Sequence, residues 1–170
     1  MVPFICYTNI MKTLFERTKE LIEILSQQQQ TVTCAESCTG GRIAAALTAV
    51  PGASAVLHGT VVTYANTIKH RWLGVKESTL ETYGAVSREC VDEMLSGVLE
   101  MADADCAIAV SGIAGPAGGT PDKPVGTVYI GIRTPKTSTV YHNVFKGDRE
   151  SIQDQSVVFA IEKLLHMLKK

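Results

Sequence analysis

A serine in one segment of the chain has the type and setting that nucleophilic catalysis requires. Ser37 lies in the segment 35–41, between a predicted strand and a helix that Gly40 and Gly41 open. A serine at such a turn is exposed, and it attacks a carbonyl group when a base removes its proton. The alternative is a tight turn before a helix, with Ser37 or Thr39 as the N-cap.

Lys69 is the best candidate for the base that Ser37 needs. No histidine has an identifiable carboxylate partner, which disfavours a Ser-His-Asp triad. Lys69 follows a predicted strand ending at Tyr64, and Tyr64 is a candidate to orient Lys69 or relay a proton. A lysine acts as a base only when burial or a nearby cation lowers its pKa by several units. The alternative for Lys69 is a solvated surface charge.

Two later segments have the composition of anion-binding sites. The segment 111–120 is rich in glycine and small residues, so its backbone N–H groups can form an anion nest; the alternative is a flexible connection. Arg149, in the first turn of the last predicted helix, could bind a phosphate. An equally supported role is an ion pair with Asp148, Glu150 or Glu36.

Hydrophobic periodicity predicts the elements that must position these residues. Strands are expected at about 31–36, 58–65, 106–111, 126–134 and 138–147, and helices from 11, 41, 66, 78, 87 and 148 onward. Alternating helix and strand, then a hairpin and a closing helix, predict a single three-layer α/β/α domain with a mixed sheet. Ligands bind beyond the carboxyl ends of strands in such sheets, so the segments after 36, 64, 111 and 147 should meet.

Composition limits the class of protein. The 170 residues suit one domain, which we place at 12–170, with 1–11 as a loose N-terminal extension. A net charge of −1 without a basic stripe gives no indication of nucleic-acid binding. No apolar run approaches a membrane span. Five cysteines without a zinc-type spacing predict reduced thiols, a cytoplasmic location and no metal site.

Several motifs together, in one order, resemble the C-terminal domain of the competence/damage-inducible protein CinA. The resemblance runs from about residue 12 to the end of the chain. The motifs are TCAESCTGG at 33–41, GTVVTYAN at 59–66 followed by Lys69, GAVS at 84–87, SGIAGP at 111–116, KPVGTV at 123–128 and GDR at 147–149.

The resemblance implies an activity and a set of roles. Stand-alone members of the family are nicotinamide-nucleotide amidases, which convert nicotinamide mononucleotide and water to nicotinate mononucleotide and ammonia in pyridine-nucleotide recycling. Ser37 would be the nucleophile, Lys69 the base and Tyr64 an assisting group, while N–H groups near residues 39–41 would hold the oxyanion. The candidate substrate-binding residues are Glu36, Thr39, Gly40, Gly41, Ser111, Gly112, Ile113, Ala114, Gly115 and Arg149.

The resemblance requires no metal and no organic cofactor, and its only small-molecule partner is the mononucleotide. Nucleic acid and membrane are not expected as partners, and a homodimer or higher homo-oligomer is expected. Cys38 is a rival nucleophile, because a position at a helix start would lower the pKa of its thiol. Two other functions stay open: a catalytically silent interaction module linked to competence or DNA damage, and an amidase for another small substrate.

Overall fold

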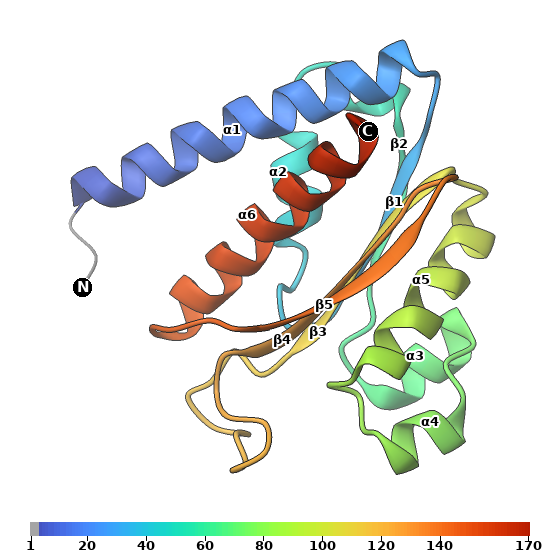
Figure 1. Cartoon of the computed structure of the whole chain (residues 1–170), viewed down its shortest axis with the longest axis vertical. Helices are drawn as coiled ribbons and strands as arrows, with labels where there is room; N and C mark the ends of the chain where they lie inside the picture. The colour runs from blue at the N-terminus through green and yellow to red at the C-terminus, as the bar shows by residue number, and fades with distance from the viewer. Residues whose placement is uncertain (1–3) are drawn as a thin grey trace.

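The computed structural model describes residues 4–170, and of residues 4–12 it describes the backbone alone. Within this part lie five strands and six α-helices, which alternate up to α3 and are then grouped as three helices, three strands and a closing helix (Figure 1). The strands are β1 (Val32–Glu36), β2 (Leu57–Val62), β3 (Cys106–Gly112), β4 (Thr127–Arg133) and β5 (Ser138–Val144). The helices are α1 (Phe4–Gln27), α2 (Arg42–Thr48), α3 (Asn66–Leu73), α4 (Glu77–Thr82), α5 (Arg88–Ala102) and α6 (Arg149–Leu168), with a 3-10 turn at Ala53–Ala55.

The strands form one mixed sheet in the order β2-β1-β3-β4-β5. β1 is parallel to both β2 and β3, whereas β4 is antiparallel to β3 and to β5. Four strands, all except β4, therefore run in the same direction. Their carboxyl ends lie at one edge of the sheet, where a ligand site is expected.

Helices cover both faces of the sheet, and two cores result (Figure 1). On one face α1, α2 and α6 pack on alternate sheet residues such as Cys34, Ile108 and Ile130. On the other face α5 packs on Ala107 and Ala109, with α3 and α4 beside it. Every residue of β1 and all but the last residue of β3 are buried, because both faces of these central strands are covered. The predicted three-layer α/β/α domain with a mixed sheet is confirmed.

Local sequence signals explain where two of the helices begin. The Ser87 hydroxyl accepts from the Cys90 N–H at 3.2 Å and caps α5, and the Asp148 carboxylate accepts from the Ser151 N–H at 2.9 Å and caps α6. Both caps agree with the helix starts predicted at 87 and 148. The N-cap of α2 is Gly41 without a side-chain cap, so the interpretation of Ser37 or Thr39 as its N-cap is wrong.

The first helix begins earlier than the sequence analysis placed it. α1 starts at Phe4, so residues 4–11, set apart as a loose extension, continue its backbone, and residues 1–3 lie outside the described part. Between residues 4 and 170, no helix is long and apolar enough to cross a membrane. Residues 13–170, whose side chains are described, contain no group of three or more potential metal ligands from His, Cys, Asp and Glu. Cys34, Cys38, Cys90 and Cys106 are buried free thiols, and Cys6 lies among the residues whose side chains are not described.

Candidate active site

The carboxyl ends of β1, β2, β3 and β5 surround a pocket of about 190 Å³. Each of the segments expected to meet there contributes at least one residue. The lining consists of Ser37, Cys38, Tyr64, Asn66, Lys69, Ala85, Val86, Ser111, Gly112, Ala114 and Arg149. The prediction that these segments converge is therefore confirmed by the geometry.

Lys69 and Ser37 are in direct contact at the base of this pocket. The Lys69 Nζ lies 3.1 Å from the Ser37 Oγ, although the two residues belong to different segments of the fold. Lys69 is on the inner face of α3 and only 1% exposed, and Ser37 is 8% exposed. The interpretation of Lys69 as a solvated surface charge is wrong, because α3 directs this side chain inward beneath the end of β2.

The surroundings of the Lys69 amine favour its neutral form. Burial lowers the pKa of Lys69, because the charged amine loses its hydration. No carboxylate within the described residues forms an ion pair with it. The Nζ donates to the carbonyl of Thr63 at 2.6 Å and to that of Tyr64 at 3.2 Å. A neutral amine has two N–H groups for these carbonyls, and its lone pair is then left for the Ser37 hydroxyl proton.

Glu36 holds the turn that carries Ser37 and does not line the pocket. Its carboxylate is fully buried and accepts three backbone N–H groups: Gly41 at 3.0 Å, Ile43 at 3.2 Å and Ala44 at 2.9 Å. These are donors at the start of α2 that would otherwise lack partners. Glu36 therefore ties the end of β1 to the start of α2, and its prediction as a substrate-binding residue is not supported by its position.

The turn depends on glycine at two positions. Gly40 and Gly41 have φ values of 60° and 95°, which other residues adopt only with strain. The Gly40 N–H donates to the Ser37 carbonyl at 3.1 Å, and the Gly41 N–H donates to Glu36. Neither N–H is left for a ligand, so the predicted oxyanion donors at 40 and 41 are wrong.

The backbone N–H groups of Cys38 and Thr39 differ from those of Gly40 and Gly41, which are bound within the turn. Within the described part of the chain, the N–H groups of Cys38 and Thr39 donate to no other protein group. Consecutive unpaired N–H groups form an anion-binding concavity. Of these two residues Cys38 lines the pocket, whereas Thr39, which was expected among the oxyanion donors, is fully buried and does not line it.

Arg149 reaches the pocket from α6 without forming the predicted ion pairs. Its guanidinium donates to the Gly115 carbonyl at 2.8 Å and to the Tyr64 hydroxyl at 3.0 Å. No ion pair of Arg149 with Asp148, Glu150 or Glu36 is present among the described residues. Arginine has more N–H donors than these two contacts use, so Arg149 keeps donors for an anionic ligand.

Several of the predicted residues connect the segments that form the walls of the pocket. Ser111 donates from its hydroxyl to the Ala85 carbonyl at 2.7 Å and so joins two walls. Ile113 exchanges backbone hydrogen bonds with Thr127 and Gly126, which closes the loop after β3. Thr39, Gly40, Gly41, Ile113 and Gly115 do not line the pocket, whereas Ser111, Gly112 and Ala114 do.

Sequence reasoning assigned no role to three residues of the lining. Asn66 is the first residue of α3 and directly follows the segment after β2, so its polar side chain was a signal. Ala85 and Val86 belong to a motif noted in the sequence, but their apolar side chains gave no indication of a site.

The rival nucleophile Cys38 has the wrong electrostatic surroundings. It is 5% exposed, and burial raises the pKa of its thiol to about 12. The expectation that this pKa is lowered is wrong, because the effect of burial outweighs the lowering by a backbone hydrogen bond. A thiol with such a pKa is almost entirely protonated at neutral pH, and the thiolate is the reactive form.

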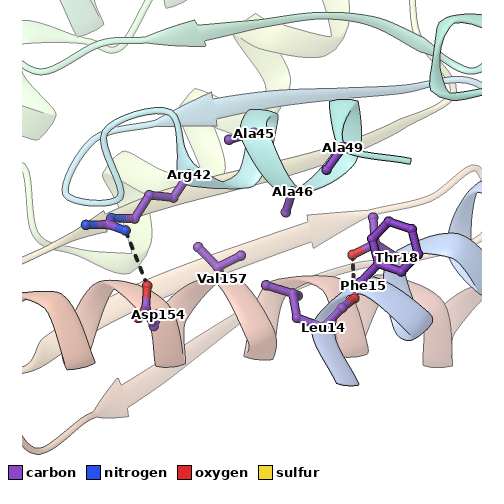
Figure 2. Close-up of a pocket in the computed structure, with 9 residues that line it drawn as sticks. All are labelled: Leu14, Phe15, Thr18, Arg42, Ala45, Ala46, Ala49, Asp154 and Val157. Carbon is purple, nitrogen blue, oxygen red and sulfur yellow. Dashed lines mark hydrogen bonds and ion pairs between the residues drawn. The ribbon is translucent and has the colours of Figure 1, made fainter. Parts of the chain in front are cut away.

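A second pocket, of about 220 Å³, lies between α1, α2 and α6 (Figure 2). Its lining is largely apolar and includes Leu14, Phe15 and Val157. At one end Arg42 and Asp154 form a 3.4 Å ion pair. Among residues 13–170, whose side chains are described, no serine, cysteine or histidine lines this pocket.

The fold and the pocket residues together define a domain of the CinA class, and the comparison of families agrees. Residues 15–168 match the CinA C-terminal domain, and the chain belongs to this family. It is 49% identical over 156 residues to a protein of Enterobacter agglomerans named nicotinamide-nucleotide amidohydrolase PncC, covering 91% of this chain and 94% of that protein.

Other relatives are longer. A CinA-like protein of Thermotoga neapolitana is 48% identical over 156 residues, which cover 91% of this chain but 38% of that protein. The chain thus spans well under half the length of the CinA-like relatives that it matches.

Solved structures have the same fold. The competence damage-inducible protein A of Klebsiella pneumoniae superposes with a TM-score of 0.89 at 40% identity, covering 92% of this chain and 97% of that one. The competence/damage inducible protein CihA of Agrobacterium tumefaciens gives 0.88 at 38% identity, covering 92% and 96%.

Proposed function

We propose that this chain is an amidohydrolase that converts nicotinamide mononucleotide and water to nicotinate mononucleotide and ammonia. The observation that carries the proposal is the 3.1 Å contact between the buried Lys69 amine and the Ser37 hydroxyl. Burial lowers the pKa of Lys69, which increases the fraction of neutral amine that can act as a general base, and a serine beside such a base is an activated nucleophile.

The first half of the reaction forms an acyl-enzyme. Ser37 Oγ attacks the carboxamide carbon while neutral Lys69 takes the hydroxyl proton, and the carbonyl oxygen becomes an oxyanion. The N–H group of Cys38, which lines the pocket, stabilises that charge. As the carbon–nitrogen bond breaks, the Lys69 ammonium returns its proton to the leaving nitrogen, which departs as ammonia.

The second half restores the serine. A water molecule gives a proton to neutral Lys69 and attacks the ester carbon. The second oxyanion collapses, the ester bond to Ser37 breaks, and the Lys69 ammonium returns the proton to Ser37 Oγ. One base therefore serves both halves, and the products are the carboxylic acid and ammonia.

Arg149 is the group that selects a phosphorylated substrate in this proposal. It lies at the start of α6, and it keeps unpaired N–H donors beside the pocket. Arginine binds phosphate through two parallel hydrogen bonds. Tyr64, 62% exposed at the pocket rim, offers an aromatic surface for the pyridine ring.

One relative supports this substrate. The Enterobacter agglomerans protein named as the amidohydrolase is matched over nearly all of its length, so the comparison covers a complete protein of similar size. A homo-oligomer, a cytoplasmic location and the domain bounds 12–170 remain predictions.

The deciding experiment measures ammonia release by the purified chain from four compounds: nicotinamide mononucleotide, nicotinamide, nicotinamide riboside and the dinucleotide. We expect release from the mononucleotide, strongly reduced release from the riboside, and none from the mononucleotide with Ser37→Ala. A folded chain that releases no ammonia from any of the four would contradict the proposal and favour another amide substrate or the silent interaction module.

A further inference from the structure

We propose that the Ser37 pocket binds the carboxylate product more tightly than the amide substrate, through an ion pair with Lys69 in its ammonium form. The product is then an inhibitor whose affinity increases as the pH falls. The inference rests on the proposed amide hydrolysis at Ser37, and it adds a form of regulation at the same site. The observation behind it is the position of the buried Lys69 Nζ, 3.1 Å from the Ser37 Oγ.

The second half of the reaction brings a product oxygen to Lys69. A general base lies within about 2.6–3.2 Å of the oxygen whose proton it takes, so the water that attacks the ester is hydrogen-bonded to the Lys69 Nζ. The oxygen of that water becomes one of the two carboxylate oxygens. The other is the former carbonyl oxygen, which accepts from the Cys38 N–H. The new carboxylate is therefore formed in contact with the Lys69 amine.

The proton of the newly formed acid also has an acceptor in the pocket. When the ester bond breaks and Lys69 returns its proton to the Ser37 Oγ, the product is a carboxylic acid beside a neutral amine. A carboxylic acid has a pKa of about 4, far below that of an amine, so its proton passes to Lys69. The O–H bond of the acid breaks and an N–H bond forms, with no other change. The resulting complex holds a carboxylate and an ammonium group in direct contact.

The surroundings of Lys69 provide no competing anion for its ammonium form. Of the side chains that the structure describes, those of residues 13–170, no carboxylate lines the pocket, and Arg149 in the lining is a cation. The Glu36 carboxylate is bound by three N–H groups at the start of α2. Burial raises the pKa of Cys38 to about 12 and that of Cys90, on the adjacent helix α5, to about 11. Both thiols are therefore neutral below about pH 9, and a carboxylate ligand supplies the counter-ion that the protein does not.

The amide substrate offers Lys69 no such charge. Its carboxamide is neutral, and hydrogen bonds between charged groups are roughly twice as strong as neutral ones. Above the lowered pKa of Lys69 the amine of the free protein is neutral, so carboxylate binding takes up a proton from solvent and amide binding takes up none. Because the two ligands share the ribose and the phosphate, the difference between them isolates the group that faces Lys69.

Binding to Ser37→Ala, which keeps Lys69 but cannot form the acyl-enzyme, compares the two ligands directly. Isothermal titration calorimetry in Tris and in HEPES, buffers with different heats of protonation, measures both Kd and the number of protons exchanged. At neutral pH we expect nicotinate mononucleotide to bind at least roughly tenfold more tightly than nicotinamide mononucleotide. At higher pH the acid should take up as much as one more proton than the amide, and its Kd should rise by up to about tenfold per pH unit while that of the amide stays constant.

The double variant Ser37→Ala with Lys69→Met is the matched control. Methionine has a long unbranched side chain like lysine but takes up no proton, so the extra proton and most of the preference for the acid should disappear. If this variant does not fold, the proton count of Ser37→Ala alone decides. In the wild type, added nicotinate mononucleotide should inhibit ammonia release competitively, with an inhibition constant that falls as the pH is lowered toward neutrality.

The measurements distinguish the failure of each idea. If Ser37→Ala binds neither mononucleotide and the wild type releases no ammonia from nicotinamide mononucleotide, the proposed function fails and the inference fails with it. If the wild type is active but Ser37→Ala binds acid and amide equally, or with equal numbers of protons at every pH, the inference alone is wrong. An extra proton that persists in the double variant would assign the charge to a group other than Lys69, which would also overturn the inference.

Discussion

Arg149 and Tyr64 are 85 residues apart in the chain, yet the Arg149 guanidinium donates a 3.0 Å hydrogen bond to the Tyr64 hydroxyl. This contact joins the start of α6 to the segment after β2 at the rim of the pocket. The Tyr64 hydroxyl thus contacts Arg149, and it is the backbone carbonyl of Tyr64 that contacts Lys69. The proposed role of Arg149 and the Tyr64 hydroxyl in substrate binding can therefore be tested separately from the proposed role of Lys69 in catalysis.

Replacing Arg149 should weaken binding of a phosphorylated substrate selectively. Charged hydrogen bonds contribute about 1.5–3 kcal/mol each, so Arg149→Met should raise KM for nicotinamide mononucleotide roughly 10- to 100-fold. Steady-state kinetics checks this, with Arg71→Met, an exposed arginine on α3, as the control of equal charge. An unchanged KM in Arg149→Met would mean that the phosphate binds elsewhere.

Removing the Tyr64 hydroxyl should leave the chemical step largely intact. Lys69 lies within 3.1 Å of Ser37 and needs no relay, and it keeps the Tyr64 carbonyl in Tyr64→Phe. We expect kcat within about fivefold of the wild type, since a neutral hydrogen bond contributes about 0.5–1.5 kcal/mol. A loss of several orders of magnitude would instead show that the hydroxyl transfers the proton.

Cys38 should resist alkylation in the folded protein. Burial raises the pKa of this thiol to about 12, so at pH 8 roughly one molecule in ten thousand carries a thiolate. We expect iodoacetamide to leave activity unchanged, and mass spectrometry to find Cys38 modified only after denaturation. Rapid inactivation of the wild type but not of Cys38→Ala would return Cys38 to the role of nucleophile.

The sequence was a good guide to the elements and a weaker one to the contacts between them. The ends of β1, β3 and β4 were predictable because apolar runs stop at polar or glycine-rich segments, whereas β2 and β5 end three residues before the predicted 65 and 147. Ser87 and Asp148 marked helix starts. The burial of Lys69 was not predictable from composition, because lysine is usually exposed and only packing of α3 encloses it. The Gln153 contact with Cys38 spans 115 residues, beyond the reach of any local pattern.

Glu36 shows a local limit of the same kind. Its position before the nucleophile suggested contact with substrate, but its carboxylate is bound by N–H groups five to eight residues later. A sequence indicates that a carboxylate is near a site, whereas the backbone conformation at Gly40 and Gly41 decides where it points.

Lys69→Met should abolish activity without unfolding the protein. Methionine removes the buried amine, which is costly to desolvate, but leaves the Thr63 carbonyl without its 2.6 Å donor. These effects oppose each other, so we expect the free energy of unfolding to change by about 1 kcal/mol or less, while kcat falls at least roughly 10³-fold. Denaturant titration and ammonia release measure the two quantities. A variant that loses activity only in proportion to its loss of folded protein would argue for a structural lysine.

The pH dependence of rate and of stability should have the same sign, because both depend on the neutral form of Lys69. Burial lowers the pKa of Lys69 in the folded protein below its usual value of about 10.4. We therefore expect kcat/KM to rise with pH until Lys69 is neutral, and to level off below pH ~10. Between the folded and the unfolded pKa only the unfolded chain holds the proton, so the free energy of unfolding should also rise with pH in this window. Lys69→Met should lack this rise, so the stability of the wild type relative to Lys69→Met should increase with pH. A rate that falls with pH over the same range would require a protonated lysine, and would exclude Lys69 as the base.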